Sequence, residues 1–185
     1  MIKAKWWILV VTLAVFFVSS FAKAGELHDA AERGDVNRVK QLLNAGVDVN
    51  AKNNDYGSTA LIVTSTVGHT EVVKILLEKG ADVNAKDGGE KGRGNTALTQ
   101  ASILSHAEVV KILLEKGADV NSENKYGDTA LMGAAAAGQT KIVKALLQKG
   151  ANVNTKNKYG WSALMMAVKK GHTEVVNLLK QAGAK

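Results

Sequence analysis

The residues of this 185-residue chain that could carry out acid–base or metal chemistry recur at a fixed spacing. His69, His106 and His172 occupy one position of a repeated segment, and Gln139 stands at the same position of a further copy. A row of histidines can bind a metal ion. Because Gln139 interrupts the row, we interpret these histidines as structural and expect no bound metal.

Glutamates follow the same spacing at Glu71, Glu108 and Glu174, with Lys141 at the remaining copy. This pattern is typical of exposed residues in a first helical turn, where the helix dipole favours a negative charge. No serine, histidine and acidic residue form a pattern that predicts a catalytic triad. The glycine-rich segment 88–94 lacks the Gly-Lys-Ser/Thr ending of a phosphate-binding loop. We therefore expect no catalytic activity, no cofactor and no small-molecule substrate.

Aromatic side chains are concentrated in the predicted loops. After residue 24 they are Tyr56, Tyr126, Tyr159 and Trp161, and Arg93 occupies the position equivalent to the tyrosines in the remaining loop. Tyrosine, tryptophan and arginine are the residues most enriched in the energetic centres of protein interfaces. The alternative is that the tyrosine rings pack on neighbouring loops and stabilise the fold. Trp161 is the strongest candidate for contact with a partner.

Residues 1–24 have the pattern of a secretory signal peptide. Lys3 and Lys5 precede a mainly apolar run over residues 6–18, and the segment ends in the small residues Ala22 and Ala24 around one lysine. This pattern predicts export and cleavage after Ala24. The apolar run is shorter than the ~20 residues that span a bilayer, although an uncleaved anchor is the alternative. We expect a periplasmic or secreted protein, bacterial by preference, that meets a membrane only through this segment before cleavage.

Charge is distributed unevenly along the rest of the chain. Without the three lysines of residues 1–24, 21 basic residues face 17 acidic ones, which gives a net charge of +4. Residues 25–140 hold 12 basic and 16 acidic residues, whereas residues 141–185 hold nine lysines and only Glu174 as an acid. This lysine-rich C-terminal end could bind an acidic partner or an anionic membrane surface, or it could be a solvated end of the fold. Export and the scarcity of aromatic residues there argue against nucleic acid.

Internal repetition indicates the fold. The phrase Lys-Gly-Ala-Asp-Val-Asn and its close variants end at Asn50, Asn84, Asn121 and Asn154, separated by 34, 37 and 33 residues. Thr-Ala-Leu or Ser-Ala-Leu recurs with the same spacing, and its hydroxyl residue is a good helix N-cap. Apolar residues then follow at helical spacing up to a terminating glycine. Each unit predicts two short helices that cannot cover their own apolar face, so the units must stack as an all-α solenoid.

These motifs together resemble the ankyrin repeat. The 33-residue spacing, the Thr-x-Leu helix start, Gly-His-x-Glu-Val-Val-Lys and Gly-Ala-Asp-Val-Asn-Ala agree in phase over residues 25–185. The resemblance implies a curved stack of helix–turn–helix units with projecting β-hairpin loops. We place the repeats at 25–51, 52–85, 86–122, 123–155 and 156–185.

The chain departs from the family pattern in three ways. It has no proline, so the usual Thr-Pro-Leu-His is replaced by Thr-Ala-Leu. Ser105 stands where the other repeats have glycine, at a cost of about 1 kcal/mol if a left-handed conformation is kept. The loop of the 86–122 repeat carries four extra residues within 86–94, a segment that we expect to be mobile.

The resemblance also implies a docking surface, because partners of the family lie against the hairpin tips and the inner helices. Ile103 and Leu104 form the one bulky aliphatic pair predicted to face outward there, and an apolar patch ringed by polar groups is typical of a binding site. Carried over position by position, the predicted docking residues are Tyr56, Ser58, Arg93, Asn95, Ile103, Leu104, Lys125, Tyr126, Asp128, Lys158, Tyr159, Trp161, Lys169 and Lys170.

The sequence therefore predicts an exported, non-catalytic, monomeric scaffold that binds another protein. It could act as an inhibitor, an immunity factor or a protective factor. The alternative is a chain that binds an acidic partner or a membrane surface through its lysine-rich C-terminal end.

Overall fold

The computed structural model describes residues 23–53 and 55–185. The predicted signal segment lies almost entirely outside the described residues and stays a prediction. Residues 23–33 are helical and lead into α2, and the remaining elements follow in chain order. Their bounds are α2 (Val36–Asn44), α3 (Ala60–Val67), α4 (Thr70–Glu78), α5 (Ala97–Ile103), α6 (Ala107–Glu115), α7 (Ala130–Ala136), α8 (Thr140–Gln148), α9 (Ala163–Lys170) and α10 (Thr173–Gln181).

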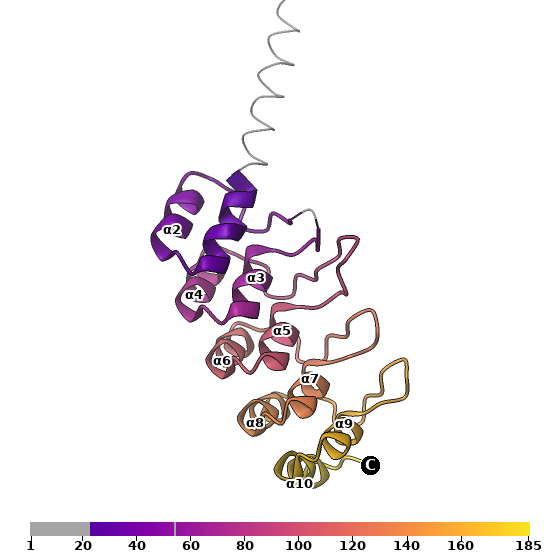
Figure 1. Ribbon diagram of the computed structural model, residues 1–185. Helices are drawn as coiled ribbons and strands as arrows, with labels where there is room; N and C mark the ends of the chain where they lie inside the picture. The colour runs from indigo at the N-terminus through magenta and orange to yellow at the C-terminus, as the bar shows by residue number, and fades with distance from the viewer. Residues whose placement is uncertain (1–22, 54) are drawn as a thin grey trace, which may run out of the picture.

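The helices stack in two columns (Figure 1). The inner column is the helix at 23–33 followed by α3, α5, α7 and α9, and the last four pack on one another in that order. The outer column is α2, α4, α6, α8 and α10, again in sequence. Long loops extend from the inner column on the side away from the outer one. This arrangement confirms the predicted all-α repeat solenoid.

Hydroxyl residues start the inner helices, as predicted. Thr59, Thr96, Thr129 and Ser162 each accept a hydrogen bond from the backbone amide three residues further on. This bond satisfies one of the amides left without a partner in a first helical turn. The caps show how the inner helices begin without the proline that the family pattern usually supplies.

Leucines from both columns form a continuous core. Leu61, Leu98 and Leu131 of the inner helices are fully buried, as are Leu76 and Leu113 of the outer helices. All five belong to one cluster of buried apolar side chains that extends through the repeats. Because burial of apolar surface is the main favourable term in folding, each unit depends on its neighbours for stability.

The Asp-Val-Asn phrase links one repeat to the next. The Asp82 carboxylate accepts from the backbone amide of Asn84 at 2.9 Å and closes a local turn. The Asn84 side-chain oxygen accepts from the backbone amide of Asp119, in the following repeat, at 2.8 Å. The same bridge recurs at Asn50, Asn121 and Asn154. The repeated phrase is thus explained by backbone hydrogen bonding along the stack.

Candidate docking surface

One side chain closes each projecting loop. The Asn124 side-chain oxygen accepts from the backbone amides of Tyr126 at 2.9 Å and Asp128 at 3.0 Å. Asn53, Asp87 and Asn157 occupy equivalent positions and close their own loops. Among the described residues, the isolated β-bridge is that between Lys52 and Thr59, so the loops are hairpins without regular strands.

The loops are also joined to one another through their backbones. The amide of Lys125 donates to the carbonyl of Arg93 at 2.8 Å, and the amide of Lys158 donates to the carbonyl of Tyr126 at 2.9 Å. The Asn157 side chain adds a hydrogen bond to the Asp128 carboxylate at 2.7 Å. Successive loops therefore form one connected layer beside the inner helices, and this layer fixes the backbone from which the tyrosine side chains project.

Two predicted docking residues are buried and cannot contribute exposed side chains. Ser58 and Asn95 are each 6% exposed. The carbonyl of Ser58 bonds the His28 ring at 2.9 Å, and the Asn95 side-chain oxygen accepts from Asn124 at 3.0 Å. The prediction that these two side chains face a partner was wrong, because contacts with residues about one repeat away bury them.

The Lys125 side chain also forms a bond between neighbouring loops. The Lys125 ammonium donates to the carbonyl of Gly92 at 2.7 Å, although the side chain is exposed. Lys158, Lys169, Lys170 and Arg93 are exposed at the surface. The charged part of the predicted surface is therefore present, with one of its cations already bonded.

The tyrosine rings are exposed at the loop tips and also contact one another. Tyr126 and Tyr159 stack with ring centroids 6.4 Å apart and an interplanar angle of 25°. Tyr159 is still 69% exposed and Tyr56 50% exposed. Trp161 is half-buried, and the Lys169 ammonium lies 4.6 Å from its ring centroid. Both interpretations of the aromatic residues thus apply: the rings support the loops and leave apolar area exposed.

The four-residue insertion is packed on the preceding hairpin, contrary to the expectation of a mobile segment. The amides of Gly88 and Gly89 donate to the carbonyl of Tyr56 at 3.0 and 2.8 Å. The Lys91 ammonium lies 3.7 Å from the Asp55 carboxylate and 5.9 Å from the Tyr56 ring centroid. The backbones approach this closely because the glycines have no side chain.

Alanine at Gly89 should release this insertion, whereas alanine at Gly88 should not. A Cβ at Gly89 would lie 2.5 Å from the Gly57 amide nitrogen, but one at Gly88 would lie 4.0 Å from its nearest neighbour. We expect Gly89→Ala to raise the rate of tryptic cleavage after Lys91 and Arg93 roughly tenfold. This increase corresponds to a loss of about 1.4 kcal/mol in the local stability of the segment. Equal cleavage rates for the two variants would show that the glycine contact does not hold the segment.

The histidine row connects neighbouring repeats. The Nε2 atoms of His69, His106 and His172 bond the backbone carbonyls of Glu32, Thr66 and Ala136 at 2.9, 3.0 and 3.0 Å. Each ring thus reaches the end of the inner helix in the preceding repeat. The geometry gives these histidines a structural role, and no group of three potential ligands in the described part of the chain could hold a metal.

Two hollows lie along the surface that the inner helices and loops share. The first has a volume of about 480 Å³, and its lining includes Asp29, Glu32 and Asp55 beside the Tyr56 ring. The second has a volume of about 350 Å³ and is mainly apolar. Its lining includes Ile103, Met132, Ala136, Ala137 and Met166.

A family model of ankyrin repeats, three copies long, matches residues 27–124 and 117–185. The chain belongs to the ankyrin-repeat family. Ankyrin repeats are protein–protein interaction modules and are typically non-catalytic. A search of curated proteins finds no match for the chain. None of the helices that the structure describes is long and apolar enough to cross a membrane.

Sequence reasoning missed the acidic end of this ankyrin array. Asp29 and Glu32 lie three residues apart on the first helix and therefore share one face. They are equivalent to Val63 and Thr66 of the next repeat, which line the same hollow. Aligning the first helix with the others could have revealed them, because the docking residues were carried over only for the repeats with a complete hairpin.

Proposed function

We propose that this ankyrin-repeat chain is an exported, monomeric scaffold that binds a partner protein through its loop tips and its inner helices. The observation that carries the proposal is the gathering of exposed apolar side chains from separate repeats on one face. Ile103 and Leu104 are 41% and 44% exposed, and the tyrosines lie on the neighbouring loops. Isolated exposed apolar residues are ordinary, but a group beside two hollows is typical of an interface.

The linked loops favour binding. Because backbone bonds join each loop to the next, the loop backbones that carry the tyrosines lose little conformational freedom when a partner covers them. Less of the interaction energy is then spent on ordering the surface. Export rests on the pattern of residues 1–24, and inhibition, immunity and protection are the roles that such a scaffold could serve outside the cytoplasm.

The test is a double variant, Tyr126→Ala with Trp161→Ala, in an affinity capture from the native compartment. We expect the captured partner to be lost, because interface centres cost about 2 kcal/mol or more when truncated. Loss of the ring stacking and of the Lys169–Trp161 contact should lower stability by only about 1–2 kcal/mol. Circular dichroism and thermal unfolding would check that the fold is kept.

The matched control replaces two exposed residues of the outer helices, Lys74→Ala and Lys111→Ala. These substitutions change as many side chains but leave the proposed face intact, so capture should persist. If the aromatic double variant retained the same partner at the same affinity, the proposed face would be wrong.

A further inference from the structure

The side chains along the inner helices change from acidic to basic over the length of the stack. The last turns of these helices line the two hollows, and equivalent positions can be followed from repeat to repeat. One such row reads, from the first repeat to the last, Glu32, Thr66, Ile103, Ala136 and Lys169. The row therefore has an acidic end, an apolar middle and a basic end.

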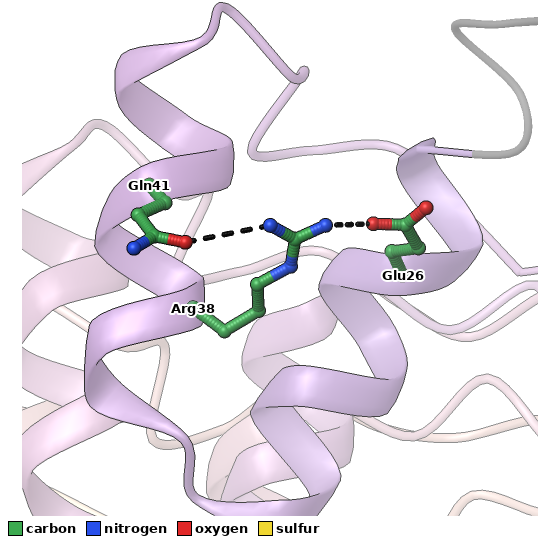
Figure 2. A network of polar contacts seen from close by, with 3 residues as sticks. All are labelled: Glu26, Arg38 and Gln41. Atoms are coloured by element: carbon green, nitrogen blue, oxygen red, sulfur yellow. Dashed lines mark hydrogen bonds and ion pairs between the residues drawn. The ribbon is translucent and has the colours of Figure 1, made fainter.

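The acidic end is formed by Asp29 and Glu32, both exposed and both lining the first hollow. Arg38 does not neutralise them, because its guanidinium pairs with Glu26 and donates to Gln41 at 3.4 Å (Figure 2). Within the described ranges the ion pairs are this one and Lys91–Asp55, and neither includes Asp29 or Glu32.

Three further charges lie near this end and do not reverse its sign. Arg33 lies on the same helix but does not line the hollow. Asp87 lines the hollow but is buried and accepts from the backbone amides of its own loop. Asp55 also lines the hollow, and Lys91 lies 3.7 Å from its carboxylate. That pair is exposed on both sides, so each partner is easily replaced by a competing charge.

The middle of the row is the second hollow, which is mainly apolar. Its one acidic lining residue, Asp128, accepts a hydrogen bond from the Asn157 side chain. Gly133 makes room for the Ile103 side chain, because a Cβ there would lie 2.5 Å from Ile103 Cγ1. The Ile103 side chain can therefore rest on α7, and Met132 and Met166 line the hollow from α7 and α9. Methionine adapts its shape easily, so the hollow suits one large apolar side chain of a partner.

The basic end is formed by Lys169 and Lys170 at the end of α9. They follow Met166, which lines the second hollow, by three and four residues and so lie on the same side of the helix. Lys169 also lies over the Trp161 ring. Residues 141–185 contain one acid, Glu174, and it lies in the first turn of the outer helix α10. A partner carboxylate at this end would meet two ammonium groups.

We propose that this face takes a protein segment whose side chains run from basic through apolar to acidic, with its basic end over the first repeat and its acidic end over α9. The proposal rests on the proposed function and names the partner's chemistry. Helices packed 8–10 Å apart put the first helix and α9, four steps apart, roughly 35 Å from each other. An α-helix of about 23 residues has that length.

Two synthetic peptides of one composition test the order of charges. The ordered peptide carries lysines at one end, leucines in the middle and glutamates at the other end, whereas the mixed peptide alternates the same charges around the same leucines. By calorimetry at low salt, we expect the ordered peptide to bind the full chain at least about tenfold more tightly. Equal affinities would overturn the proposal, as would no binding of the ordered peptide at about 1 mM.

Charge exchange on the protein provides the sharper test. We expect two double variants to bind the ordered peptide about tenfold or more weakly than the original protein. One combines Asp29→Lys with Glu32→Lys, and the other combines Lys169→Glu with Lys170→Glu. The variant that combines all four changes has its poles exchanged, so the peptide should bind again in the opposite direction, within about threefold of the original affinity. These positions are exposed, and the hydrogen bond to His69 uses the Glu32 backbone, so the fold should be kept.

Two results would reject the inference about the order of charges without rejecting the proposed function. If the variant with all four substitutions did not regain binding of the ordered peptide, the order of the charges along the face would not determine binding. If vesicles of anionic lipid bound the lysine-rich end and the ordered peptide did not compete, that end would serve a membrane instead. In either case partner capture that still depends on Tyr126 and Trp161 would keep the protein-binding scaffold, whereas its independence of them would reject the scaffold face itself.

Discussion

Replacing Gly68 by alanine is expected to lower the free energy of unfolding by about 3 kcal/mol or more. Gly68 ends α3 in the left-handed conformation, with φ +93°. A Cβ there would also lie 2.4 Å from Nδ1 of the His106 ring, which crosses from the next repeat. Alanine is therefore unfavourable for two reasons. Its backbone is strained at this φ, and its Cβ displaces the His106 ring that bonds the Thr66 carbonyl.

Gly80 offers the matched control. It has nearly the same backbone conformation, φ +86°, but a Cβ there would have no neighbour within 4 Å. Gly80→Ala should therefore cost only the backbone term, about 1–2 kcal/mol. Urea unfolding of both variants isolates the steric part. In a His106→Ala background the two costs should become equal, and a persistent difference would show that the ring is not the obstacle.

Replacing Gln139 by histidine should destabilise the protein by about 2 kcal/mol, although histidine is the residue that three of the other four repeats carry there. The reason is Ser105, the only residue other than glycine with positive φ, +70°, in the described ranges. At the equivalent glycines Gly34, Gly68 and Gly138, a Cβ would lie 2.8, 2.4 and 2.7 Å from the histidine ring. Ser105 carries such a Cβ, so a ring at position 139 has no room.

Gln139 avoids this conflict because its side-chain amide donates to the carbonyl of Ala137, in its own repeat, at 3.2 Å. It makes no bond to α5, the inner helix of the preceding repeat. Ser105→Gly alone should stabilise the protein by about 1 kcal/mol. Together with Gln139→His, it should restore both the ring and a hydrogen bond to the Ile103 carbonyl, and this double variant should be the most stable of the four.

A double-mutant cycle in urea measures the coupling between positions 105 and 139. We expect a coupling free energy of at least about 2 kcal/mol, with histidine unfavourable beside Ser105 and favourable beside glycine. If Gln139→His had the same effect in both backgrounds, the two departures from the family pattern would be independent. The cycle therefore tests whether the repeats tolerate these two changes only as a pair.

Local patterns in the sequence were enough to predict the solenoid and much of its surface. The hydroxyl residues at positions such as Thr59 cap helices because each needs only an amide three residues away. Leu76 and Leu113 are buried because their helices repeat an apolar face that stacking covers. Ile103 and Leu104 are exposed, as the repeat alignment predicted. Ser105 keeps the left-handed conformation of the glycines at the equivalent positions.

The tertiary structure alone decided which of the predicted surface residues are accessible. Ser58 and Asn95 have polar side chains typical of exposed loops, yet contacts with His28 and Asn124 bury them. The insertion around Gly89 has a composition typical of mobile segments, yet it packs on the hairpin before it. Each of these outcomes depends on atoms roughly one repeat away in the chain. The sequence states the residue types at both places, but only the stacking of the repeats sets the distance between them.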